Sequence, residues 1–193
     1  MRKKSHLALA GYLLNGMENE TLRRRWKAFY FGSVLPDLKP SFVTKRHEYE
    51  ATFDLVAGKL RALSCAEGDC PVDSMRYIMD LGQVLHYIAD YFTFPHNPNY
   101  PGNLKAHCIY EKRLKKRLRV CVREDRVLFP IQYRMPCSAD EILEEIRKLH
   151  QAYMEEPSDV ERDCDYITTA CARVLFSLLQ FQPAPAAKLA CAG

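Results

Sequence analysis

The segment from Met75 to Phe92 repeats its apolar residues every three or four positions, a spacing that only an α-helix places on one side. Pro95 and Pro98 follow it, and proline stops a helix. The same segment carries His86 and Asp90, which lie four residues apart and hence one turn apart on one helix face. The pattern predicts a long central helix that bears a paired imidazole and carboxylate. Its predicted core side consists of Met75, Ile78, Met79, Leu85, Ile88 and Phe92.

The helical pattern continues along most of the chain, and no segment shows the polar–apolar alternation of a strand. Ser5, Asn103 and Ser138 are each predicted to cap a helix, and Glu141 completes a capping box with Ser138. The helix that begins at Asn103 carries a second imidazole–carboxylate pair. Further helices are expected over about 21–31, 43–63, 138–154 and 158–181.

A chain of 193 residues with 48% hydrophobic and 27% charged residues has the size and composition of one globular domain. We therefore predict an all-α, single-domain bundle of six or seven helices over residues 1–182, with a flexible tail over 183–193. No segment reaches the roughly 18 uninterrupted apolar residues of a membrane span. The formal net charge of +4 is too small to indicate nucleic-acid binding by itself.

The first residues, MRKKSH, precede an apolar run that is too short for a secretory signal and lacks a small-residue cleavage site. We therefore expect a mature N-terminal helix in a cytoplasmic protein. The eight cysteines form no CxxC pair. In such a protein they are expected to be reduced and mostly buried.

The second pair, His107 and Glu111, repeats the four-residue spacing of the first, and His96 lies between the two pairs. Imidazole and carboxylate together suit zinc. Other candidate ligands lie upstream. The complete set, enough for two or three metal ions, is His6, Asp37, His47, His86, Asp90, His96, His107 and Glu111.

A single pair of this kind is more often a pair of side chains on a helix surface. Two pairs with a histidine between them favour metal binding. The remaining histidine, His150, is interpreted as a surface residue. The chain has no His-Asp dipeptide, which phosphohydrolases of the HD class need, and no Glu-x-x-His motif of di-iron bundles.

The set resembles the zinc-dependent phospholipase C family of bacteria and the related single-strand-specific zinc nucleases. The family pattern His-x3-Asp-x5-His, then His-x3-Glu, is present as His86, Asp90, His96, His107 and Glu111. A Pro-Asp and a following histidine match Asp37 and His47, and an N-terminal histidine matches His6. The ordered match covers about residues 1–111. The resemblance implies an all-α protein with a cluster of three zinc ions.

The resemblance also implies how the ligands divide. One zinc takes Asp37, His47, His86 and Asp90, and a second takes His96, His107 and Glu111. The third takes His6 and the first residue of the chain, with Asp90 bridging to the first zinc. Secreted members begin with a processed tryptophan, whereas this chain begins with Met1, whose amine we expect in that place. The alternatives are a backbone carbonyl further along and an incomplete third site.

The resemblance implies phosphodiester hydrolysis in which zinc activates water and neutralises the phosphate oxygens, with Asp37 as a ligand and the catalytic base. From a phospholipid, diacylglycerol and a phosphorylated headgroup result. The alternatives are a single-strand nuclease or another phosphodiesterase at the same site, and a non-catalytic metal-binding relative. Glu111 favours the phospholipase branch, because the nuclease branch usually has Asp there. The spacings from Asp37 to His47 and from His96 to His107 are shorter than in secreted members, which leaves the substrate open.

The basic run from Lys112 to Arg119 is most simply a solvated helix face. Peripheral contact with an anionic membrane is the sharper alternative, and nucleic-acid binding is a third. Tyr91, Phe92, Phe94 and Tyr100 flank the candidate ligands. Such aromatic residues suit core packing, lipid chains or stacked bases.

Overall fold

A computed structural model describes residues 1–38, 48–65, 71–123, 136–157 and 159–180 of the chain. Eight α-helices and two short 3-10 helices make up this part, which contains no strand, so the expected all-α fold is confirmed. The predicted tail over 183–193 lies outside these residues. The elements are α1 (Lys3–Gly16), α2 (Glu20–Arg24), α3 (Trp26–Val34), η1 (Pro36–Leu38), α4 (Tyr49–Ser64), α5 (Met75–Tyr91), η3 (Phe94–His96), α6 (Leu104–Cys121), α7 (Ala139–Glu155) and α8 (Val160–Gln180).

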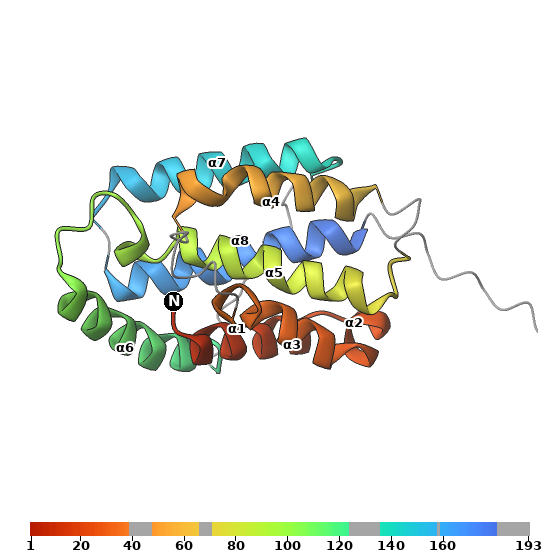
Figure 1. Cartoon of the computed structure of the whole chain (residues 1–193), viewed down its shortest axis with the longest axis horizontal. Coiled ribbons are helices and arrows are strands. Elements are labelled where there is room, and N and C mark those ends of the chain that lie inside the picture. Colours follow the sequence, from red (N-terminus) through yellow and green to blue (C-terminus); the bar gives the residue numbers. More distant parts are fainter. Residues whose placement is uncertain (39–47, 66–70, 124–135, 158, 181–193) are drawn as a thin grey trace, which may run out of the picture.

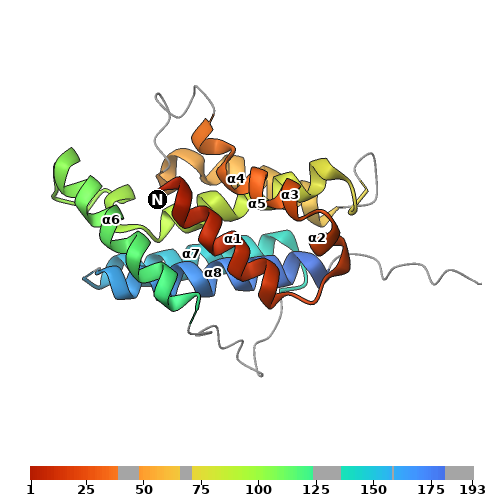
Figure 2. The same ribbon diagram turned by 90° about the horizontal axis from the view of Figure 1, so that it is seen from below.

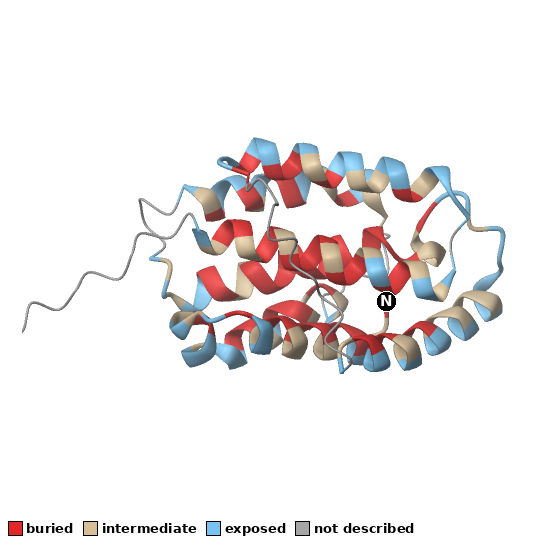
Figure 3. Cartoon of the chain, turned by 180° about the vertical axis from the view of Figure 1, so that it is seen from behind, coloured by how far each residue is buried: buried red, intermediate tan, exposed pale blue. Residues whose placement is uncertain are grey.

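Helix α5 is the predicted central helix and runs through the middle of the bundle (Figures 1 and 3). The chain is buried without a break from Leu81 to Thr93, because α3, α4 and α8 all pack against α5. Met75 was predicted to face the core but is 56% exposed. It is the first residue of the helix, next to the cap Ser74, so that prediction was wrong.

Two glycines allow α3 and α5 to approach until their backbones touch. A Cβ atom on Gly32 would lie 2.2 Å from the carbonyl oxygen of Met79, and one on Gly82 would lie 2.5 Å from that of Phe29. Only glycine fits at such distances. The approach places the end of α3, and η1 after it, beside the C-terminal half of α5.

Two helix starts differ from those predicted. Helix α1 begins at Lys3 with Arg2 as its N-cap, because the Arg2 carbonyl already accepts the amide hydrogen of Ser5. Ser5 is therefore a buried residue inside the first turn and not the cap. The helix expected over 21–31 is two helices, because the backbone at Arg25 leaves the helical conformation. This division accounts for eight helices where six or seven were expected.

The caps Asn103 and Ser138 are confirmed, since their side chains accept hydrogen bonds from the amides of Ala106 and Glu141. Helix α6 crosses one end of the bundle beside the start of α1, and it packs against α1 and α8 (Figures 1 and 2). Among the helices that the structure describes, none is both long and apolar enough to cross a membrane.

Candidate metal centre

Three buried side chains meet between the start of α1 and the end of α5. His6, His86 and Asp90 each offer a ligand atom, and these atoms lie within 4.8 Å of one another. The imidazole rings are stacked with their centroids 3.8 Å apart. Asp90 Oδ1 lies 3.4 Å from Nε2 of His6, and Asp90 Oδ2 lies 3.3 Å from Nε2 of His86. We call these three residues the inner cluster.

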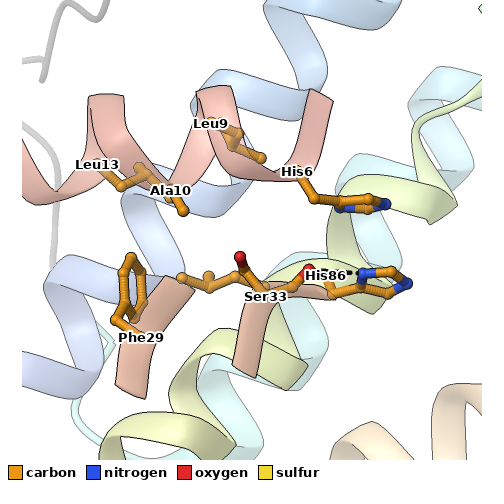
Figure 4. A pocket seen from close by; sticks show the side chains of 8 residues that line it. His6, Leu9, Ala10, Leu13, Phe29, Ser33 and His86 are labelled. Carbon is orange, nitrogen blue, oxygen red and sulfur yellow. Dashed lines mark hydrogen bonds between the residues drawn. The ribbon is translucent and has the colours of Figure 1, made fainter. Parts of the chain in front are cut away.

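The backbone of α3 orients His86. Its Nδ1 lies 2.8 Å from the carbonyl oxygen of Ser33 (Figure 4). Because a carbonyl can only accept, Nδ1 donates this hydrogen bond, and Nε2 is directed toward Asp90. Metal-binding histidines are commonly held in this way.

His6 has no comparable partner. Both of its ring nitrogens are buried, and neither forms a hydrogen bond with any residue that the structure describes. Burial and the neighbouring His86 lower the pKa of His6 to about 3, so the ring is neutral. A buried polar group without a partner costs about 1–3 kcal/mol. A metal ion bound to Nε2 of His6, the nitrogen that faces Asp90, would supply the missing interaction. The donor set therefore fits a bound cation.

A small, mostly apolar pocket lies behind the two stacked rings (Figure 4). The low polarity of its walls strengthens electrostatic interactions within the inner cluster. Besides His6 and His86, the pocket is lined by Leu9, Ala10, Leu13, Phe29, Ser33 and Leu85.

A second group, the outer cluster, joins η3 to α6. It consists of His96, His107 and Glu111, whose ligand atoms also lie within 4.8 Å of one another. Glu111 Oε1 is 3.4 Å from Nε2 of each histidine. The His107 side chain is 29% exposed, so this cluster lies at the solvent side of the centre.

The amine of Met1 lies between the two clusters. It donates a hydrogen bond to Asp90 Oδ1, and its nitrogen is 3.0 Å from His96 Nε2 and 3.4 Å from Glu111 Oε1. Burial alone lowers the pKa of this amine, but the charges of Asp90 and Glu111 raise it above its ordinary value. Asp90 also reaches the outer cluster directly, since its Oδ2 lies 3.8 Å from His96 Nδ1.

The carboxylates stay ionised despite their burial, which by itself raises a carboxyl pKa. The Met1 amine and His96 hold the pKa of Asp90 well below its usual range. Hydrogen bonds with His107 and His96 lower the pKa of Glu111. Burial and the Met1 amine lower the pKa of His96, which favours its neutral, metal-binding form.

Asp37 reaches the centre from η1, directly after α3. Its side chain is only 6% exposed, and its Oδ1 lies 3.7 Å from Nε2 of His86. The structure thus brings Asp37 together with the inner cluster. His47 lies outside the described residues, so its place in the centre stays a prediction.

Sequence reasoning missed Asp163, a fully buried residue of α8. Its carboxylate accepts hydrogen bonds from the Phe94 amide and from the hydroxyls of Tyr110 and Tyr153, at 3.0, 2.9 and 2.6 Å. Burial raises the pKa of Asp163 to about 6, although these hydrogen bonds oppose the rise. The residue ties η3 and α6, which carry the outer cluster, to α8. An isolated aspartate without a motif gives no sequence signal for this role.

His150 is not the surface residue that was predicted. Its ring stacks on Tyr49 with the centroids 4.0 Å apart, and its Nε2 lies 3.0 Å from Asn97 Oδ1. The Asn97 amide donates to the carbonyls of Tyr91 and Thr93. His150 therefore supports the segment that leads from α5 through η3, and burial lowers its pKa to about 4.

The four aromatic residues near the centre divide into two kinds. Tyr91 and Phe92 are fully buried core residues. Phe94 and Tyr100 are partly exposed, with ring centroids 5.1 Å apart, and Tyr100 lies edge-on to His107. Only these two could contact a substrate at the outer cluster.

A family model described as zinc-dependent phospholipase C matches residues 5–159. This range includes every predicted metal ligand except Met1. No curated protein and no solved structure matches the chain significantly.

Proposed function

This chain belongs to the zinc-dependent phospholipase C family, and from that premise we propose that it hydrolyses a phosphodiester bond of a phospholipid. A water oxygen bonds to phosphorus, the bond from phosphorus to the glycerol oxygen breaks, and that oxygen takes up a proton. Diacylglycerol and a phosphorylated headgroup result. The observation that carries the proposal is the pair of clusters that meet at Asp90 within the matched range.

Two or three zinc ions are the proposed cofactor. The groups that would hold them are the Met1 amine and the side chains of His6, Asp37, His47, His86, Asp90, His96, His107 and Glu111. Bound zinc would act as a Lewis acid. It would lower the pKa of a bound water and neutralise negative charge on the phosphate oxygens. The neutral imidazole of His6, which forms no hydrogen bond with the described residues, and the orientation of His86 Nε2 toward Asp90 support this assignment.

Asp37 is the proposed catalytic base. One of its carboxylate oxygens would orient the attacking water and accept a proton from it. Asp90 and Glu111 are poorer candidates for this role, because their lowered pKa values make them weak bases.

The test combines metal analysis of the purified chain with assays on a phosphatidylcholine analogue and on single-stranded DNA. Asp37→Asn is expected to lower kcat by about 100-fold or more while much of the zinc stays bound. Asp54→Asn, at an exposed position of α4, is the matched control and should change neither quantity.

Each competing function predicts a different result. Cleavage of DNA with the phospholipid left intact would assign the centre to a nuclease, with Phe94 and Tyr100 as candidate stacking residues. A purely structural metal site would show no turnover and only a loss of stability in Asp37→Asn. Fewer than two bound metal ions per chain would contradict the multinuclear site.

A further inference from the structure

The start of α1 lies beside α6 (Figure 2), and both carry basic residues at positions exposed or partly exposed near the outer cluster. We call these residues together the α1/α6 basic surface. It consists of Arg2, Lys3 and Lys4 from the start of α1 and of Lys105, Lys112, Lys115, Lys116 and Arg119 from α6.

The two helices contribute to a single concentration of positive charge. Arg2 donates a hydrogen bond to the carbonyl oxygen of Cys108 in α6 at 3.1 Å, which joins the two halves. The pKa of Lys115 is lowered by partial desolvation and by its cationic neighbours, among them Arg119 of α6 and Lys4 of α1.

Most of this charge has no carboxylate partner among the residues that the structure describes. Within the described part of the chain, Arg2 alone among these eight residues lies near one, with its Nε 3.9 Å from Glu111 Oε2. On the opposite side of α6, by contrast, Arg117 is paired with Glu161 of α8. An unpaired cationic surface of this kind attracts an anionic partner.

Exposed aliphatic side chains lie among the basic ones. Leu104 is 79% exposed, Ile109 53% and Val120 41%, and all three belong to α6. Basic and aliphatic side chains on the exposed side of one helix are typical of helices that lie in a lipid interface. Exposed leucine and isoleucine add nothing to binding of a phosphate backbone, so the combination favours a bilayer over nucleic acid.

We propose that the α1/α6 basic surface docks the protein on an anionic phospholipid bilayer. The inference rests on the proposed function only in taking a bilayer as the source of substrate. Helix α6 carries the docking residues on its outer side and His107 and Glu111 on its inner side. Docking through this helix would hold the metal centre within one helix diameter, about 10–12 Å, of the headgroups.

The test measures co-sedimentation of the full chain, on ice, with vesicles of phosphatidylcholine alone or mixed with phosphatidylserine. Binding should require phosphatidylserine and weaken as salt rises, since salt screens exposed charges. The triple variant Lys112→Gln, Lys116→Gln, Arg119→Gln should bind the mixed vesicles about 100-fold more weakly, because each basic residue near an anionic surface contributes several-fold.

A matched triple variant controls for net charge. Arg23→Gln, Lys27→Gln, Arg76→Gln removes three exposed charges from α2, α3 and the first turn of α5. Helix α2 lies at the opposite end of the molecule from α6 (Figure 1). This control should bind like the unaltered chain. Equal losses in both triples, or equal binding to both kinds of vesicle, would overturn the proposal.

The double variant Leu104→Asn, Ile109→Asn separates a bilayer from nucleic acid. It should weaken vesicle binding about tenfold, because the aliphatic side chains no longer enter the interface. Binding of single-stranded DNA should not change. If the basic triple lost only DNA binding and the aliphatic double lost nothing, nucleic acid would be the partner.

Hydrolysis of a short-chain phosphatidylcholine dissolved as monomers measures the proposed reaction apart from docking. An unaltered chain that binds anionic vesicles but does not cleave this substrate would refute the proposed function and leave docking intact. A chain that cleaves it but shows no preference for anionic vesicles would refute docking alone.

Discussion

Glu111 and Asp90 of the metal centre each contact four basic groups, and Asp90 is the carboxylate that joins the two clusters. Its oxygens meet the Met1 amine, both imidazoles of the inner cluster and His96 of the outer cluster. From the sequence, the four-residue spacing pairs Asp90 with His86, and the family resemblance implies that Asp90 bridges two zinc ions. Its additional contacts come from the first turn of the chain and from the segment that follows α5.

His150 gives a prediction that does not depend on the proposed function. Its pKa is about 4 in the folded protein and near 6.5 when exposed, so between these values the unfolded chain binds more protons. The free energy of unfolding should therefore have its full value above pH 6.5 and decrease as the pH drops toward 4. Tyr49 and Tyr91, whose rings face His150, have pKa values raised by burial and stay neutral throughout this range.

His150→Gln should reduce this pH dependence, because glutamine keeps an amide near Asn97 but takes up no proton. Urea unfolding gives the free energy of unfolding of both chains at pH 5 and at pH 7. The effect is the difference between the two chains in how much this free energy changes with pH. Other groups that titrate in this range act on both chains alike, so they cancel in the comparison. If the free energy of unfolding falls by the same amount in both chains between pH 7 and pH 5, protonation of His150 is not the cause of the pH dependence.

At the scale of elements, the contact between α3 and α5 positions the inner cluster. It brings the Ser33 carbonyl to His86, and it places η1 so that Asp37 reaches the same imidazole. The contact depends on Gly32 and Gly82, because any Cβ there would overlap the opposite backbone. The geometry of the metal centre thus depends on two glycines that are not themselves proposed ligands.

Gly82→Ala should force α3 away from α5, cost about 1–3 kcal/mol of stability and reduce zinc content, because His86 loses its Ser33 partner. Gly58→Ala is the matched control. Gly58 is an exposed residue within α4, and a methyl group added there would meet no other atom, so alanine should raise stability by up to about 1 kcal/mol. Equal stability and equal zinc content in the two variants would show that the close approach is not required.

At the scale of the whole molecule, α8 belongs to the same unit as the metal centre although the family match ends at residue 159. It packs against α1, α5, α6 and α7, and it buries Ile167, Leu175 and Leu178 completely. Its Asp163 accepts hydrogen bonds from Phe94 of η3 and Tyr110 of α6, the two elements that carry the outer cluster. The domain is therefore proposed to extend to residue 182.

Truncation tests this domain boundary. A chain that ends at residue 182 should keep its melting temperature and zinc content, because only the predicted tail is lost. A chain that ends at residue 159 should not unfold cooperatively, because α8 no longer covers α5 and α6. Circular dichroism during heating, with metal analysis, measures both. Cooperative unfolding of the shorter chain would place α8 outside the domain.

The sequence by itself determined the all-α class, the caps Asn103 and Ser138, and the two four-residue pairs of imidazole and carboxylate. These are local properties, since helix periodicity and capping depend on residues within a turn or two of one another. Membership of the family was likewise predicted from ordered motifs.

Only the tertiary structure decided that His6 stacks on His86, that the Met1 amine lies between the clusters, and that Asp163 and His150 support the elements around them. Each of these contacts joins different helices or loops, and several join segments far apart in the chain. They exist because glycines let α3 meet α5 and because α6 crosses one end of the bundle and packs on α1 and α8, which no local pattern in the sequence records.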